Sequence, residues 1–221
     1  MENNGNLSGP ERQAEMDFFY TTLSPDKIPW NIESPPQALI ELVTTGKVKP
    51  CKTLDLGCGA GNYAIYLAGL GFDVTAVDIS PAAIGLAREM AKKKGTTIDF
   101  RVADLLGDPT DLNGLYGFIF EWDVLHHIYP EQRRRYVTNI SRFLQVNGLY
   151  LSVCFHEDDP LFGGIGKLRT TTIGTRLYFS SQKELKKLFE PFFRIVEMKT
   201  MEVEGKTPGF HVVNYLLMTT R

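Results

Sequence analysis

The chain has little of what marks secreted, membrane or nucleic-acid-binding proteins. Its 221 residues include three cysteines, Cys51, Cys58 and Cys154, an odd number without metal-ligand spacing, which fits free thiols in a reducing cytoplasm. No apolar run approaches the roughly 18 residues of a membrane-spanning helix, and the N-terminal residues lack a secretory signal pattern. The formal net charge is −2, so there is no general attraction to nucleic acid or membrane. We expect a cytoplasmic protein with a small-molecule substrate, no nucleic-acid or membrane partner and no bound metal.

The length and the element pattern predict one α/β domain without internal repeats. Strand-like and helix-like segments alternate from residue 53 to residue 154, which predicts a parallel sheet with helices on both faces. Residues 155–179 read mainly as a long loop. The expected helices are Glu11–Tyr20, Pro35–Thr45, Asn62–Ala68, Pro81–Lys94 and one from Ser181 to Glu190, and the expected last two strands are Phe193–Met201 and Phe210–Thr220.

The most informative segment is residues 53–62, TLDLGCGAGN, in which an apolar strand runs into a glycine-rich loop. Gly57, Gly59 and Gly61 allow a sharp turn and a close approach of a ligand to the backbone. A dinucleotide fingerprint has its third glycine one residue later and directs a helix N-terminus at a pyrophosphate. Asp55 stands at the loop entrance, where a carboxylate repels phosphate but suits an ammonium group. S-adenosylmethionine (SAM) carries an ammonium and a sulfonium group and no phosphate, so the segment favours SAM.

Two further acids follow the next two predicted strands. Asp78 ends the strand Phe72–Val77, about 20 residues past the loop, where a carboxylate can accept hydrogen bonds from both ribose hydroxyls. That role does not by itself separate SAM from NAD. Asp104 follows the strand Ile98–Val102, where it either accepts a hydrogen bond from an adenine amino group or caps a helix. Acids at the ends of three successive strands predict a site for a cationic adenosyl ligand.

Taken together, these motifs resemble those of the class I SAM-dependent methyltransferases. LDLGCGAGN is similar to the first motif of that family, VDIS to its ribose motif and VADLL to its adenine motif, and GFIFEWDVLHHI with FLQVNGLYLSVCF resembles its fourth and fifth strands. The resemblance implies a Rossmann-like α/β fold with seven strands in the order 3-2-1-4-5-7-6, the seventh antiparallel. IPWNIESPPQAL and the HHI segment resemble the small-molecule branch that includes thiopurine, thiol and tellurite-type methyltransferases. Asn31 stands where that branch has an acid.

The resemblance also implies which segments and residues hold the cofactor. It divides the chain into N-terminal lid helices over residues 1–45 and a SAM-binding core over residues 46–221, in which 156–179 form a loop on the substrate side. The glycine loop holds the methionyl end, Asp78 the ribose, and Asp104 the adenine. The expected cofactor-binding residues are Trp30, Asp55, Gly57, Cys58, Gly59, Asn62, Asp78, Ile79, Asp104, Leu105 and, through its backbone, Glu121. The product is S-adenosylhomocysteine.

The acceptor side is less defined by sequence. His126 and His127 are the candidates for a general base, although paired histidines after a strand also pack or cap helices. Transfer to a thiolate scarcely needs a base, because holding donor and acceptor at near-attack distance supplies most of the acceleration. Trp30 either covers the sulfonium with its indole face or anchors its loop in the core. The residues expected to contact the substrate are Tyr20, Trp122, Arg169 and Arg176, and the basic run 133–135 is expected to face solvent.

The predicted function is transfer of a methyl group from SAM to a small molecule, with a sulfur, selenium or tellurium nucleophile favoured. The alternatives are O- or N-methylation of a small metabolite, a non-catalytic SAM-binding protein, and a nicotinamide-dependent oxidoreductase. The sequence EWDV at 121–124 lacks the prolines of DNA and RNA amino-methyltransferases, which argues against adenine methylation. Both a monomer and a homodimer remain open.

Overall fold

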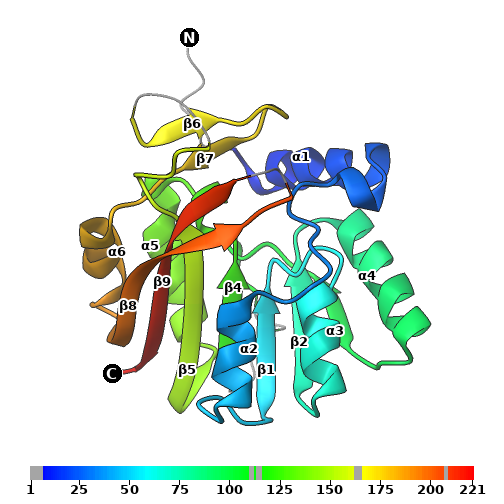
Figure 1. Cartoon of the computed structure of the whole chain (residues 1–221), viewed down its shortest axis with the longest axis horizontal. Helices are drawn as coiled ribbons and strands as arrows, with labels where there is room; N and C mark the ends of the chain where they lie inside the picture. Colours follow the sequence, from blue (N-terminus) through cyan, green and yellow to red (C-terminus); the bar gives the residue numbers. More distant parts are fainter. Residues whose placement is uncertain (1–6, 110–111, 113–115, 162–165, 207–208) are drawn as a thin grey trace.

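A seven-stranded sheet forms the centre of the molecule (Figure 1). A computed structural model of the chain describes residues 7–109, 112, 116–161, 166–206 and 209–221. The strands of this sheet lie in the order β3-β2-β1-β4-β5-β9-β8. Their bounds are β1 Lys52–Leu56, β2 Asp73–Asp78, β3 Asp99–Val102, β4 Tyr116–Trp122, β5 Leu144–Phe155, β8 Phe193–Glu204 and β9 Phe210–Thr220.

The pairing directions confirm the predicted topology. Strands β1 to β5 pair in parallel, and β9 runs antiparallel both to β5 and to β8. Because β9 is inserted between β5 and β8, the last two strands of this sheet reproduce the expected order 5-7-6. The carboxyl ends of β1, β2 and β4 therefore meet at one edge, where open α/β sheets bind ligands.

Helices cover both faces of the sheet and bury one hydrophobic core on each. Helices α2 (Gln37–Thr44), α3 (Asn62–Gly69) and α4 (Pro81–Lys94) contribute buried side chains to one core. Helices α5 (Pro130–Ser141) and α6 (Gln182–Phe189) contribute to the other. Local signals set their ends as expected: Ser80 caps α4 by accepting a hydrogen bond from the Ala83 N–H at 3.0 Å, and Gly95 ends it with φ +67°.

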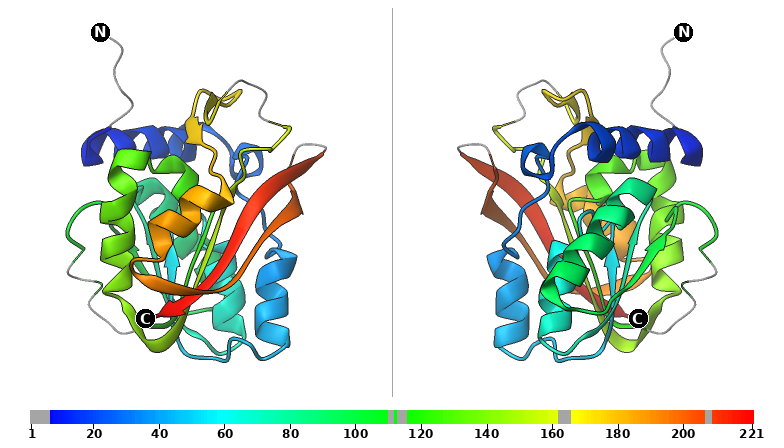
Figure 2. Two further views of the ribbon diagram at one scale, coloured as in Figure 1. Left: turned by 90° about the vertical axis from the view of Figure 1, so that its left-hand side faces the viewer. Right: turned by 90° about the vertical axis from the view of Figure 1, so that its right-hand side faces the viewer.

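The N-terminal helix lies across the ligand-binding edge. Helix α1 (Gly9–Thr22) and the short 3-10 helix η1 (Pro25–Lys27) run over the carboxyl ends of the strands, and both views of Figure 2 show α1 on this side. Asp17 fastens α1 to the start of α4, where its carboxylate accepts hydrogen bonds from the Ser80 hydroxyl and, at 3.1 Å, from the Ala82 N–H. In the described part of the chain, no helix is long and apolar enough to cross a bilayer.

Two expectations about local structure differ from what is found. The segment 156–179 is more than a loop: β6 (Leu168–Thr170) and β7 (Arg176–Tyr178) pair antiparallel in a small sheet of their own, and residues 162–165 lie outside the described residues. The basic run 133–135 does not face solvent as a whole, because Arg133 is buried at 4 % exposure. Its guanidinium donates hydrogen bonds to the carbonyls of Ile128 and Leu125, which provide acceptors for the buried charge.

Candidate functional site

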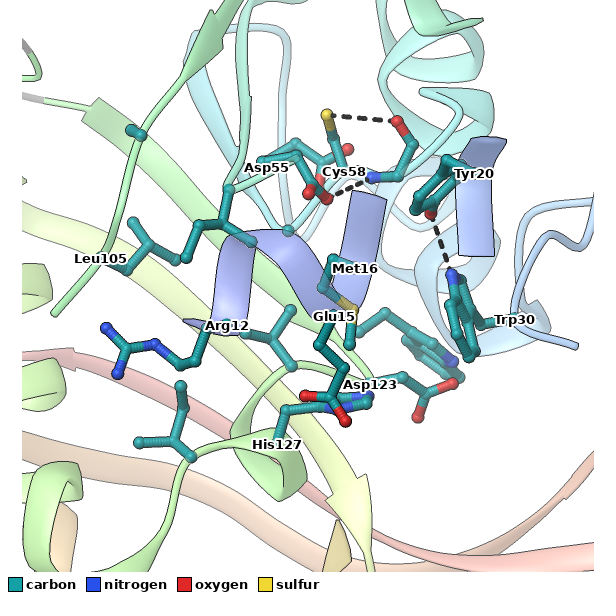
Figure 3. A pocket seen from close by; sticks show the side chains of 18 of the residues that line it. Arg12, Glu15, Met16, Tyr20, Trp30, Asp55, Cys58, Leu105, Asp123 and His127 are labelled. Carbon is teal, nitrogen blue, oxygen red and sulfur yellow. Dashed lines mark hydrogen bonds between the residues drawn. The ribbon is translucent and has the colours of Figure 1, made fainter. Parts of the chain in front are cut away.

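A cleft at the carboxyl edge of the sheet gathers most of the predicted site residues (Figure 3). Its walls come from α1, from residues 30–32, from the glycine loop and from the ends of β2, β3 and β4. The predicted residues that line it are Tyr20, Trp30, Asp55, Gly57, Cys58, Gly59, Asn62, Asp78, Ile79, Asp104, Leu105, Trp122, His127 and Arg176. Residues from Leu7 to Arg176 thus contribute to one concave surface.

The three glycines of the loop between β1 and α3 lie where a side chain has no room. Gly57, Gly59 and Gly61 all have positive φ, at +70°, +53° and +76°. A Cβ on Gly57 would meet a Val124 methyl at 2.3 Å, and one on Gly59 would meet the Tyr20 hydroxyl at 2.6 Å. Both the backbone conformation and the close approach therefore require glycine at these positions.

At the entrance of this loop, Asp55 presents a carboxylate without a partner among the described residues. The residue is buried at 3 % exposure, and its Oδ2 has no hydrogen-bond donor among the described residues. Burial, and then the nearby Asp78, raise the pKa of Asp55 well above its ordinary value. An orphaned buried carboxylate is costly. The ammonium group of SAM would supply the missing donor and the compensating charge, so this residue fits that cofactor.

Asp78 both shapes the loop and faces the cleft. Its Oδ2 accepts a hydrogen bond from the Gly59 N–H at 2.9 Å, and its Oδ1 accepts one from the Ser80 N–H at 2.9 Å. Burial raises its pKa, while these backbone hydrogen bonds act in the opposite direction. Each carboxylate oxygen keeps a second lone pair, so the two can accept the two ribose hydroxyls expected here.

Asp104 carries an ion pair that the sequence did not indicate. Its Oδ2 lies 2.8 Å from Nη2 of Arg12 on α1, and its Oδ1 accepts a hydrogen bond from the Leu106 N–H at 2.9 Å. Asp104 follows β3 and is itself followed by a turn at Leu105 and Leu106, not by a helix. The interpretation of Asp104 as a helix cap is therefore wrong. The ion pair joins α1 to the predicted adenine end of the cleft.

Trp30 and Tyr20 form a second set of contacts between the N-terminal segment and the cleft. The indole N–H of Trp30 donates to the Tyr20 hydroxyl at 2.9 Å, and the Trp30 ring meets the His127 ring edge-on, with centroids 6.2 Å apart. Asn62 at the start of α3 donates to Oδ1 of Asn31 at 2.7 Å. Trp30 is thus a wall of the cleft as well as an anchor of its own segment.

Cys58 lines the loop but is poorly suited to nucleophilic chemistry. Burial, followed by the charges of Asp55 and Asp78, raises the pKa of its thiol well above the ordinary value. The thiolate is the reactive form of cysteine. This residue therefore contributes shape and backbone rather than a nucleophile, and all three cysteines are free thiols.

Three predicted residues do not line the cleft. The Glu121 side chain is fully buried, where it accepts hydrogen bonds from the Ser152 hydroxyl and from the Val124 N–H. His126 is stacked on the Phe155 ring at a centroid distance of 4.3 Å. Arg169 donates to the Asp159 carbonyl at 2.7 Å and packs its guanidinium over a phenyl ring, so it holds its own loop together.

The end of the cleft near His127 holds polar residues that the sequence analysis did not single out. They are Glu15 on α1, Asp123 after β4 and Tyr129 before α5, and Arg176 on β7 lines the same cleft. In Figure 3, Asp123 and His127 lie toward one end and Asp55 and Cys58 toward the other. The helical spacing of Arg12, Glu15 and Met16 on one face of α1 could have pointed to the lid contribution. No group of metal-ligating side chains occurs in the described ranges.

Comparisons with known proteins agree with this geometry. A family profile described as a methyltransferase domain matches residues 53–148. The chain is 34 % identical over 130 residues to the 2-heptyl-1-hydroxyquinolin-4(1H)-one methyltransferase of Mycobacteroides abscessus, covering 58 % of this chain and 56 % of that protein. It is 30 % identical over 114 residues to the probable SAM-dependent methyltransferase TehB of Haemophilus influenzae, covering 52 % of this chain and 39 % of that one.

A solved structure extends the likeness over nearly the whole chain. The protein studied in the conversion of a disulfide bond into a thioacetal group during echinomycin biosynthesis superimposes with a TM-score of 0.79 at 24 % identity, covering 94 % of this chain and 91 % of that one. Over residues 53–148 the chain matches the methyltransferase domain, which agrees with the predicted class I SAM-dependent family and its cofactor, and the superposition confirms the predicted fold. The chain spans about half, or less, of the length of the curated relatives described above. The reaction of the whole protein is therefore proposed below from the site.

Proposed function

We propose that the protein transfers the methyl group of SAM to a small-molecule nucleophile. The observation that carries this proposal is the Asp55 carboxylate, which is buried and without a partner among the described residues, beside a loop whose glycines tolerate no side chain. A cationic donor without phosphate meets both conditions. Asp78 would hold the ribose, and Asp104, Ile79 and Leu105 would hold the adenine.

Methyl transfer requires mainly that the nucleophile and the methyl group of SAM are held in the correct positions. In an in-line displacement, the nucleophile attacks the methyl carbon while the carbon–sulfur bond breaks and its electron pair returns to sulfur. Holding the two reactants at near-attack distance contributes most of the acceleration. Trp30 and Tyr20 lie against the cleft from the lid side, where an aromatic face beside a sulfonium adds roughly 0.5–2 kcal/mol of cation–π attraction.

The lid supports a small acceptor. Helix α1 covers the cleft and is fastened at Arg12 and Asp17, so an acceptor would have to fit under this helix beside His127 and Arg176. A sulfur, selenium or tellurium nucleophile is the favoured class, and a hydroxyl or amine of a small metabolite is the alternative. The names of the Mycobacteroides abscessus and Haemophilus influenzae relatives are compatible with either.

A non-catalytic SAM-binding protein is the second candidate. It would need the glycine loop but no space for an acceptor. The polar lining at Glu15, Asp123 and Arg176 favours an enzyme, because a pure binding protein has no need to keep such groups at the far end of the cleft.

Incubation with methyl-labelled SAM and a panel of acceptors tests the proposal. The panel contains thiols, phenols, amines and chalcogen oxyanions, and the readout is label in the organic or volatile product. We expect transfer to at least one class, and an Asp55→Asn variant is expected to lose it together with SAM binding. Tight SAM binding without transfer to any class would instead support the non-catalytic alternative.

A further inference from the structure

Resting on the proposed function, we infer that Asp123 is the general base that removes the proton from the acceptor. This residue stands directly after β4, in the turn that leads to η3 (Leu125–His127), and it lines the cleft. The assignment limits the acceptor to a group that carries a proton until it reacts, such as a thiol, a hydroxyl or an amine.

The backbone at Asp123 is held in a conformation that few residues adopt. Its φ is +68°, and among the described residues only Asn147 shares a positive φ without being glycine. Such a conformation costs about 1 kcal/mol or more and persists where its surroundings enforce it, often at functional sites. The enforcing contacts are near: the Asp123 N–H donates to the Val153 carbonyl at 3.0 Å, and Val124 packs against Gly57 of the cofactor loop. The turn thus aims the carboxyl group from beside the loop that would hold the methyl donor.

The carboxyl group is partly withdrawn from water and lacks a donor in the described part of the chain. Its Oδ1 is buried without a hydrogen bond, while the side chain as a whole is 25 % exposed, so its other atoms face the cleft. The nearest imidazole nitrogen is Nδ1 of His126, 4.0 Å away. That nitrogen accepts the Phe155 N–H at 3.5 Å, so it has no proton to give. An unpaired carboxylate is free to take a proton from a ligand.

The two histidines suggested by the sequence are weaker bases than this carboxylate. Burial lowers the pKa of His127 to about 4, and burial with the neighbouring His127 lowers that of His126 well below the ordinary value. Burial raises the pKa of Asp123 to about 7. A base is most effective when its pKa lies near the working pH. By that criterion Asp123 is better suited to act as the base than either imidazole.

The titratable groups around Asp123 come from three elements and one loop. His211 on β9 lowers its pKa, whereas Asp159 raises it, and the two are themselves paired at 3.1 Å. The charge of Asp123 in turn raises the pKa values of Glu121 on β4 and Tyr63 on α3. Asp55 raises the pKa of Tyr63 as well, and Tyr63, Asp55 and Asp123 all line the same cleft.

The step balances without any further reactant. The acceptor X–H gives its proton to the Asp123 carboxylate as the X–CH₃ bond forms. The bond between the methyl carbon and the sulfonium sulfur breaks, and its electron pair stays on sulfur to give neutral S-adenosylhomocysteine. Asp123 then releases the proton to solvent when the products leave.

The test compares acceptors that do and do not need a base. The wild type and Asp123→Asn receive labelled SAM with 2-mercaptoethanol or catechol, which are protonated near neutral pH, and with 4-nitrothiophenol, which is already a thiolate. We expect the variant to lose roughly 10²- to 10⁴-fold in kcat/KM with the protonated acceptors and to keep its rate with the thiolate. Equal losses with both kinds, or no loss with either, would overturn the assignment. Weaker binding of S-adenosylhomocysteine by the variant would do so too, because it would make Asp123 a cofactor ligand.

A second readout does not depend on turnover. Infrared difference spectra of the complex with S-adenosylhomocysteine, between about pH 5.5 and pH 8.5, should contain a carboxylic acid band that disappears near neutral pH and is missing in Asp123→Asn. A carboxyl group that is already ionised at the lower pH would contradict the assignment. If no probe is methylated, the proposed acceptor class fails, while the spectra still decide the role of Asp123. Asn147→Gly, which relaxes the other strained residue far from the cleft, is the matched control and should change neither readout.

Discussion

At the scale of the residue, the site consists of carboxylates that the fold places in different surroundings. Asp55 lacks a donor among the described residues, Asp78 accepts two backbone N–H groups, and Asp104 is paired with Arg12. An acid without a partner suits a ligand cation, whereas an acid fixed by backbone donors suits ligand hydroxyls. Similar side chains at successive strand ends can therefore recognise different parts of one molecule.

Asp78→Ala tests the ribose assignment. The change removes the acceptor for the ribose hydroxyls and also the one that holds the Gly59 N–H. We expect SAM binding to weaken by about 1–3 kcal/mol, the scale of hydrogen bonds to a charged group, measured by calorimetry. Asp73→Ala, at the exposed opposite end of the same strand, is the control and should leave the affinity as it is. Unchanged affinity in Asp78→Ala would mean that the ribose lies elsewhere.

Gly59→Ala tests whether the loop must stay free of side chains. A Cβ there would lie 2.6 Å from the Tyr20 hydroxyl, at φ +53°. We expect a loss of both folding stability and SAM affinity. Gly46 also has a positive φ, +71°, but nothing within 4 Å of an added Cβ, so Gly46→Ala should cost only about 1–2 kcal/mol of stability without changing affinity. Thermal unfolding and calorimetry on both variants separate the two effects, and equal affinity in Gly59→Ala would refute the account of the loop.

At the scale of the element, the cleft depends on segments that the sheet itself does not contain. Helix α1 is joined to the core through Arg12 and Asp17, and the β6–β7 sheet is joined to η3 and α5 through Arg133. The Arg133 guanidinium reaches the Ser180 hydroxyl at 2.7 Å and lies 4.6 Å from the centre of the Tyr178 ring. One buried side chain of α5 thus holds η3 and the end of β7 together.

Arg133→Ala should accordingly destabilise the protein far more than the same change next to it. Several hydrogen bonds from one charged group are lost, and the Ile128 and Leu125 carbonyls each lose a donor. We expect a loss of about 2–4 kcal/mol in the free energy of unfolding, from urea denaturation. Arg134 is exposed on the same helix, so Arg134→Ala should stay within about 0.5 kcal/mol of the wild type. Similar losses in the two variants would contradict the structural role of Arg133.

At the scale of the whole molecule, buried acids make stability depend on pH. Burial raises the pKa of Glu121 from 4.5 to about 7, so the folded state holds a proton that the unfolded state has released. The stabilisation by this proton is present below about pH 4.5 and is lost as pH rises through about 7. Asp123 shifts in the same direction, whereas His127, with its pKa lowered to about 4, shifts in the opposite one.

Glu121→Gln isolates the contribution of this group, because the other shifted groups are common to both proteins. Relative to the variant, the cofactor-free wild type should lose up to about 3 kcal/mol of stability between about pH 4.5 and pH 8, at about 1.4 kcal/mol for each unit of pKa shift. Urea unfolding of both proteins across this range measures the difference. Parallel pH profiles would show that Glu121 does not hold its proton in the folded state.

Features set by interactions between residues close in the chain could be predicted from the sequence, whereas features set by contacts between distant residues could not. The strand, glycine loop and helix at 53–69 obey local rules, so Asp55 and the loop conformation were readable from spacing alone. The Arg12–Asp104 pair joins residues 92 apart in the chain, and nothing in either neighbourhood specifies it. Burial of Arg133 was missed because a basic run on a helix usually faces water, whereas here carbonyls from outside the helix provide acceptors for it. Asp123 was passed over because its strained turn is set by contacts with β5 and with the glycine loop.

Calorimetric titration of the protein with SAM and, separately, with NAD tests the central claim most directly, namely that acids at the sheet edge select a cationic adenosyl donor without phosphate. The account predicts that SAM binds with one-to-one stoichiometry, that the wild type shows no heat of binding with NAD, and that Asp55→Asn loses most of its affinity for SAM. Tight binding of NAD together with undetectable binding of SAM would contradict it.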